Sequence, residues 1–237
     1  MDQIEEKSLA RKTKRPVGRP RADGKPQLTK EAVFVVAARH IARDGYAGAS
    51  IRKMAVALQA APASVFNLFP TKDALLNELL AFAATPSMVF YSELDKLKIP
   101  PETALFKCIT EEVRAIASVN GDFPSIFYLP ELSKPGFEPA QEVRANMVAF
   151  YRSLIDAGCY LGVFTAEAPS LAAEQVFQLT ETSIIAEGTA SKFAPEEVAR
   201  LTARFCLRGL LVNPKDLDDI ERAANDITLS FVLPATV

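Results

Sequence analysis

Cysteine and histidine are the residue types that most often bind metals or act as nucleophiles and bases, and this chain has three cysteines and one histidine. Cys108, Cys159 and Cys206 lie about fifty residues apart, and none has a CxxC partner or a nearby histidine. His40 has no second histidine with which to share a metal or polarise a nucleophile. We therefore expect no cofactor, no metal and no catalytic residue, and an all-α enzyme is the least supported class of protein.

Basic side chains, which could bind a polyanion, gather near the N-terminus. Division of the chain after Asn77 gives residues 1–77 a net charge of +7 and residues 78–237 a net charge of −9. A basic small domain joined to a larger acidic one is typical of a nucleic-acid-binding head on a separate body. Solvated charge alone could also produce the difference.

Residues 1–27 hold many basic residues and little to bury, so they are predicted to form a flexible basic arm. Within it, RPVGRPR at residues 15–21 resembles an AT-hook, an extended strand that lays arginines into the minor groove of A·T-rich DNA. Arg19 and Arg21 would be those arginines. A solvated basic tail is the alternative.

Three helices are predicted over residues 28–77. Thr29 is a plausible N-cap for the first helix, which ends at the glycine stop Gly45. Ser50 caps a short second helix, and Pro62 occupies the first turn of a short third one. Two short helices after a longer supporting one form a helix-turn-helix.

Helical periodicity continues over residues 78–237, so the fold class is all-α, with an N-terminal three-helix helix-turn-helix domain and a C-terminal helical domain. Pro86 is expected to kink or split one long helix. No apolar run reaches the roughly 18 residues of a membrane helix, and no secretory signal is evident. We therefore expect a cytoplasmic protein that has no membrane partner. The expected helices are 72–84, 87–97, 101–118, 124–132, 138–161, 170–189, 195–211 and 215–231.

Residues 50–76 read SIRKMAVALQAAPASVFNLFPTKDALL, and this segment resembles the TetR family of transcriptional regulators. Polar helix caps, apolar positions and a Phe-x-x-Lys sequence all occur at the spacing of the family pattern, without gaps. The matching residues are Ser50, Met54, Ala55, Phe66, Phe69, Lys72 and Leu75. Three positions depart from the family pattern: Gln59 replaces a turn glycine, Ala61 a capping Ser or Thr, and Phe66 a tyrosine. Loss of the cap hydroxyl should cost about 0.5–2 kcal/mol.

The resemblance implies that the third helix reads DNA. Ala63, Ser64 and Asn67 would face base edges, and Asn67 can bond adenine through two hydrogen bonds. Ser50 and Lys72 would bind phosphates, and Arg52 and Lys53 would add positive charge at the edge of the groove. Phe66 lacks the hydroxyl of the family's tyrosine and its phosphate contact, but its ring can still pack. The alternative for Ser64 and Asn67 is ordinary helix surface.

The resemblance also implies a homodimer whose last long helices form the interface, around a body that encloses a ligand cavity. The predicted interface residues are Leu171, Val176, Leu179, Val198, Leu201 and Phe205, although each could instead be intrachain core. The predicted cavity residues are Phe82, Tyr91, Phe106, Glu111, Phe127, Tyr128, Met147, Tyr151, Phe177 and Glu181, most of which could equally be plain core. Such a cavity suits an apolar or aromatic ligand with one or two polar groups. Helix 215–231 is an addition that would cover the interface or the cavity.

The sequence thus predicts a transcriptional regulator, expected to be a repressor that a small, largely apolar effector releases from a palindromic double-stranded DNA operator. Activation instead of repression depends on where the operator lies. A constitutive architectural DNA-binding protein would also use a basic arm and a helix-turn-helix, but it would gain nothing from a large acidic helical body.

Deletion of residues 1–24 should weaken binding more for an operator with A·T-rich flanks than for one with G·C-rich flanks, because narrow A-tract grooves concentrate negative potential. Fluorescence anisotropy with the two duplexes measures this difference. An equal loss of affinity for both duplexes would show that the arm is only a basic tether. No loss of affinity would show that the arm takes no part in recognition.

Overall fold

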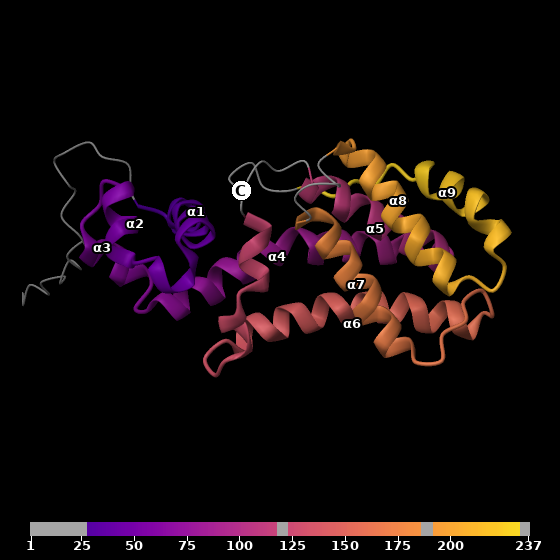
Figure 1. Cartoon of the computed structure of the whole chain (residues 1–237), viewed down its shortest axis with the longest axis horizontal. Coiled ribbons are helices and arrows are strands. Elements are labelled where there is room, and N and C mark those ends of the chain that lie inside the picture. The colour runs from indigo at the N-terminus through magenta and orange to yellow at the C-terminus, as the bar shows by residue number, and fades with distance from the viewer. Residues whose placement is uncertain (1–27, 118–122, 186–191, 233–237) are drawn as a thin grey trace, which may run out of the picture.

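The chain is described by a computed structural model covering residues 28–117, 123–185 and 192–232 (Figure 1). In those ranges the regular structure is helical, and extended pairing is limited to one isolated bridge between Phe164 and Leu211. The predicted all-α class is therefore confirmed. The arm, with Arg19 and Arg21, lies outside the described residues.

The head is formed by α1 (Lys30–Gly48), α2 (Ile51–Ala57) and α3 (Pro62–Leu68). The predicted caps are present, since the side chain of Thr29 accepts from the Ala32 N–H and that of Ser50 from the Lys53 N–H. Gly45 breaks the helical backbone as predicted, with φ of 69°, although one further turn carries α1 to Gly48. Three elements of the size and order expected from the sequence thus build the helix-turn-helix.

The turn between α2 and α3 explains the position of Gln59. Its φ of 52° is left-handed, and its N–H donates to the Val56 carbonyl while the Ala60 N–H donates to the Ala55 carbonyl. This pair of bonds is a Schellman motif, which usually places glycine at the left-handed residue. A non-glycine residue there costs about 1–2 kcal/mol, and the two hydrogen bonds and the buried helices on either side hold it in place.

Helix α4 (Lys72–Lys96) leads from the head into the body. The expected split at Pro86 is wrong, because one helix runs through the proline. Pro86 has no N–H to donate, but both halves of α4 are fixed by burial in separate cores, which offsets the lost bond. By length and composition α4 could also cross a membrane, but half of its most apolar window is buried inside the protein, as in a core helix.

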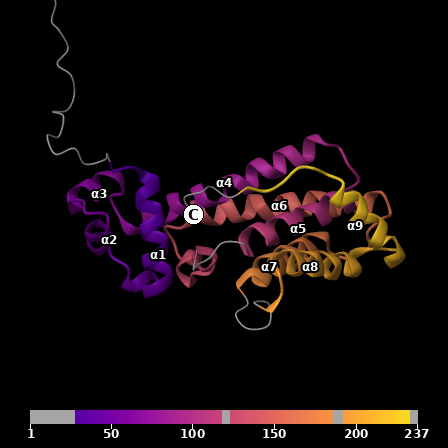
Figure 2. The same cartoon turned by 90° about the horizontal axis from the view of Figure 1, so that it is seen from above.

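The body packs four helices and a C-terminal segment around one central helix, α5, which contacts α4 and each of the others (Figures 1 and 2). Most of the α5 side chains are buried, including charged ones. The body helices are α5 (Pro101–Ala117), α6 (Glu138–Tyr160), α7 (Pro169–Ile185), α8 (Pro195–Leu210) and α9 (Leu217–Asn225).

Two expected helices are corrected. Over 124–132 the chain forms two 3-10 helices, Phe123–Tyr128 (η1) and Pro130–Ser133 (η2), because Pro130 cannot continue an α-helix. Instead of a helix over 215–231, a 3-10 turn, Pro214–Asp216, precedes α9, and residues 226–232 run without helical structure along α4 (Figure 2).

The final segment follows an extended periodicity, since Phe231 is buried while its neighbours Ser230 and Val232 are exposed. The Phe231 ring meets Phe90 edge-on at 5.8 Å, and its N–H donates to Glu111 at 3.0 Å. The segment is therefore anchored to α4 and α5 rather than to α7 or the cavity described below.

The head core does not stop at Asn77, the predicted domain boundary. It continues along α4 through Leu79 and Leu80, and it takes in Ile126 of η1 and Phe137 just before α6. Asn77 itself joins the two parts, because its side chain donates to the Gly136 carbonyl at 2.8 Å and accepts from a backbone N–H of α6. The head is thus packed directly on the end of the body formed by η1, η2 and the start of α6.

Candidate functional site

Helix α3 presents the polar face expected of a helix that contacts another molecule. Ala63 and Asn67 are exposed, Ser64 is half-buried, and Phe66 is 41% exposed. Val65 is fully buried and fixes the rotation of the helix. Pro62 starts α3 without any side-chain cap, because Ala61 supplies no hydroxyl. The four predicted α3 residues therefore lie on the sides of the helix away from the head core.

Helix α2 adds positive charge to the head. Arg52 and Lys53 are exposed, and the Lys53 ammonium donates to the Gly48 carbonyl at 3.3 Å. The Ser50 oxygen caps α2, and its hydroxyl hydrogen can still be donated to another acceptor. Val56, one turn after Arg52, was missed by the sequence reasoning, yet it is 76% exposed. An exposed apolar residue one turn from an arginine could meet a thymine methyl group.

Lys72 points toward the protein and joins α1 to α4. Its ammonium donates to the carbonyls of Tyr46 and Ala49 and lies 4.1 Å from the centre of the Tyr46 ring. The Tyr46 hydroxyl in turn donates to Asp73. Lys72 therefore fixes the start of α4 against the end of α1, and two of its three N–H groups are used in doing so.

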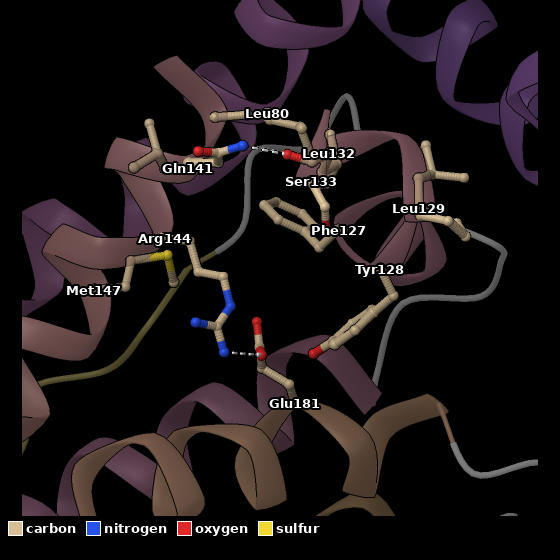
Figure 3. Close-up of a pocket in the computed structure, with 13 residues that line it drawn as sticks. Leu80, Phe127, Tyr128, Leu129, Leu132, Ser133, Gln141, Arg144, Met147 and Glu181 are labelled. Carbon is tan, nitrogen blue, oxygen red and sulfur yellow. Dashed lines mark hydrogen bonds and ion pairs between the residues drawn. The ribbon is translucent and has the colours of Figure 1, made fainter. Parts of the chain in front are cut away.

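The body contains a cavity of about 510 Å³ beside η1 and η2, between the first half of α6 and the last described turns of α7 (Figure 3). It brings together four of the predicted ligand residues, Phe127, Tyr128, Met147 and Glu181. The sequence reasoning missed Arg144, the one basic side chain among the described lining residues. The remaining lining residues are Leu80, Leu129, Pro130, Leu132, Ser133, Ala140, Gln141 and Val143.

The other six predicted ligand residues lie outside this cavity. Tyr91, Phe106, Tyr151 and Phe177 are at most 3% exposed and belong to the body core, where Tyr151 meets Tyr91 and Phe177 edge-on. Phe82 packs against Phe34 at 5.1 Å and lines a separate hollow beside the C-terminal segment. Glu111 is paired with Lys107 at 3.0 Å and Arg114 at 2.6 Å.

Glu112, which the sequence reasoning did not single out, is the buried carboxyl at the centre of the body. The Tyr91 and Tyr151 hydroxyls donate to it, at 2.7 and 2.5 Å. Burial raises its pKa, while these bonds and one from Ser87 act in the opposite direction. Its position one α-helical turn after Cys108, on the buried face of α5, is the sequence signal that could have found it.

Three polar groups meet at one end of the cavity, as Figure 3 shows for Arg144, Glu181 and Tyr128. Arg144 Nη2 lies 3.9 Å from Glu181 Oε2, and the Tyr128 hydroxyl points toward the Glu181 carboxyl. Burial raises the pKa of Glu181 to about 7, although Tyr128 and Arg144 favour its ionised form. Burial and the Glu181 charge likewise raise the pKa of Tyr128.

Helices α7 and α8 expose apolar side chains outside the cavity. Leu171 and Phe205 are 57% and 68% exposed, and Leu179 and Leu201 are about 40% exposed. By contrast Val176 is buried, and Val198 packs partly against the body core. Four of the six predicted interface residues thus lie on the surface of this helix pair, and two face inward.

Comparisons with known proteins agree with this architecture. Residues 33–79 match the model of the bacterial regulatory proteins of the tetR family. AmtR of Mycobacterium smegmatis is 26% identical, with a TM-score of 0.67 over 87% of this chain and 96% of that one. A tetR-family regulator from Rhodococcus RHA1 is 21% identical, with a TM-score of 0.64 over 78% of this chain and 100% of that one.

A third similar structure, FadR from Bacillus subtilis in complex with stearoyl-CoA, is 15% identical, with a TM-score of 0.63 over 76% of this chain and 99% of that one. No curated protein sequence matched the chain.

The raised pKa of Glu181 predicts a pH-dependent stability. Between about pH 4.5 and 7 the unfolded chain has released the Glu181 proton while the folded chain retains it. The free energy of unfolding should therefore fall as pH rises through this window, by about 3 kcal/mol if Glu181 acts alone. Urea denaturation at both ends of the window measures the change.

Glu181→Gln should remove this part of the pH dependence, whereas Glu167→Gln, which changes an exposed carboxyl before α7, should keep it. The charges around Glu181, namely Arg144, Glu174 and Glu112, are the same in both variants. Identical pH profiles for the two variants would show that the Glu181 proton is not retained on folding.

Proposed function

We propose, from the premise that this chain is a TetR-family transcriptional regulator, that it binds a two-fold symmetric DNA operator as a homodimer and leaves it when a small molecule occupies the body cavity. The observation that carries this proposal is a wall shared by the cavity and the head core. The proposed role is repression in the cytoplasm, without catalysis.

The shared wall consists of residues that belong to the head core or pack against it and also line the cavity. Leu80 and Ala140 are buried members of that core, and Phe127, Leu129 and Leu132 pack against it. Because protein interiors are close-packed, a ligand that displaces these side chains must also shift what lies on their other side. A ligand that favours one head position by 1–3 kcal/mol would change operator binding about 5- to 150-fold.

The DNA contacts follow from the exposed face of the head. Ala63, Ser64 and Asn67 of α3 would approach base edges in the major groove, with Asn67 able to bond adenine twice. The phosphates would be bound by Ser50, Arg52, Lys53 and the remaining N–H of Lys72, while Phe66 packs against the DNA backbone. The arginines of the N-terminal arm, Arg19 and Arg21, would enter the neighbouring minor groove.

The dimer would form through the exposed apolar side chains of α7 and α8. A two-fold axis beside this helix pair would bury Leu171, Leu201 and Phe205 against the same residues of a second copy. A single recognition helix contacts only a few base pairs, so a second head would double the length of DNA that is read. Both heads would then respond to ligand through their own shared walls.

Asn67→Ala should relax discrimination at one position of each half-site by about 1–3 kcal/mol, because the bidentate bond to the base is lost. The measurement is anisotropy with an operator selected from random duplexes and with single-base variants of it. Asn225→Ala, which changes an exposed asparagine at the far end of the body, is the matched control. Unchanged discrimination in Asn67→Ala would remove this residue from the recognition surface.

Phe205→Glu should convert the dimer to monomers, because an unpaired charge buried in an interface is costly. Sedimentation velocity at several concentrations measures the change. The control is Leu161→Glu, since Leu161 is 62% exposed but lies beyond the end of α6. A monomeric wild-type chain, or a Phe205→Glu variant that remains dimeric, would contradict the proposed interface.

A further inference from the structure

The polar end of the cavity contains an acceptor that no described residue satisfies. Oε2 of Glu181 is buried and accepts no hydrogen bond in the described structure. The nearest cation is Arg144, whose Nη2 at 3.9 Å is too distant for a hydrogen bond. Buried carboxylate oxygens are normally hydrogen-bonded, so this atom marks a place for a donor that comes from outside the chain.

Arg144 does not supply that donor in this arrangement, because Glu174 holds its guanidinium 3.9 Å away from Glu181 Oε2. Nη1 and Nη2 both donate to Glu174 Oε2 at 3.1 Å, and Nη1 also lies 3.4 Å from Oε1. The guanidinium in addition lies 5.2 Å from the centre of the Phe177 ring. An anionic ligand would therefore meet a guanidinium whose positive charge Glu174 already balances.

The charges around the cavity also disfavour an anion. Glu174 balances Arg144, the one cation among the described lining residues, so that the negative charge on Glu181 above about pH 7 is left in excess. Glu112 and Glu174 both act unfavourably on a negative charge at Glu181. A positively charged N–H donor beside Glu181 Oε2 would relieve this repulsion. The same group would also supply the missing hydrogen bond.

We propose that the effector of this chain is an organic cation whose ammonium N–H donates to Glu181 Oε2 and whose apolar body lies against Leu80, Phe127 and Met147. This inference rests on the proposed function, because it names the chemical class of the molecule that would occupy the same cavity. The apolar part of the lining takes the hydrocarbon, and the Tyr128 hydroxyl helps to orient the Glu181 carboxyl.

The test uses the full-length chain and isothermal titration calorimetry with three probes that share one hydrocarbon tail: n-octylammonium, n-octyltrimethylammonium and octanoate. n-Octylammonium should bind at least about tenfold more tightly than its trimethyl analogue, which has the charge but no N–H, because a hydrogen bond to a charged group is worth about that much. Octanoate should bind most weakly, since it brings a second negative charge to Glu181.

Glu181→Gln should weaken n-octylammonium binding by about 10- to 100-fold. Glu167→Gln should leave it unchanged, because that carboxyl is exposed and lies outside the cavity lining. Equal binding of all three probes, or tighter binding of octanoate, would overturn the proposal on the wild-type chain alone, whether or not Glu181→Gln folds. Unaltered n-octylammonium binding in a folded Glu181→Gln chain would also overturn it.

Operator release is measured separately, by anisotropy of labelled operator DNA with each probe. Release by octanoate but not by n-octylammonium would support ligand-responsive regulation and overturn the cation proposal. Binding of n-octylammonium that depends on Glu181 but leaves the operator bound would establish the cation site and contradict the proposed coupling to DNA. Glu181-dependent binding together with release would support both.

Discussion

The burial of one helix, α4, in two cores is the constraint on which the rest of the structure depends. Its first turns place Leu75 and Leu79 in the head core, and its last turns place Phe90 and Leu94 in the body core. Neither end can move without disturbing a close-packed interior. This double burial also offsets the hydrogen bond that is lost at Pro86, so the helix continues through the proline.

The two 3-10 helices η1 and η2 hold the head against the body. Short 3-10 segments have poorer hydrogen-bond geometry than an α-helix and are common as connectors. Phe127 of η1, Leu132 of η2 and Leu129 between them pack on the head core from one side and line the cavity from the other. A segment with weak internal bonding between two cores is a suitable place for a ligand to alter the relation of head and body.

Buried charge in the body follows two patterns. Glu111 and Glu112 have their oxygens bonded by side chains of α4, α5 and α6 or by the C-terminal segment, so each helps to fix the helices around α5. Glu181 differs, because its Oε2 has no hydrogen-bond donor among the described residues. Satisfied networks stabilise a single arrangement, whereas an unsatisfied buried acceptor costs free energy until a ligand supplies the donor.

The sequence by itself determined the local elements. The caps Thr29 and Ser50, the stop at Gly45 and the first-turn Pro62 act within one or two turns, and therefore the helix-turn-helix and the faces of its helices could be predicted from neighbouring residues. The TetR resemblance of residues 50–76 depends on this same local register and was confirmed by the family model over 33–79.

Only the tertiary structure decided that α4 continues through Pro86, that residues 226–232 are extended and which residues line the cavity. These depend on contacts between residues far apart in the chain, such as Phe231 with Glu111 or Arg144 with Glu174. Aromatic residues at helical spacing mark a core and a cavity alike, so Tyr91, Phe106 and Tyr151 could not be distinguished from Phe127 and Tyr128 by sequence. What separates them is whether a second helix fills the space in front of the side chain, and helix packing alone determines that.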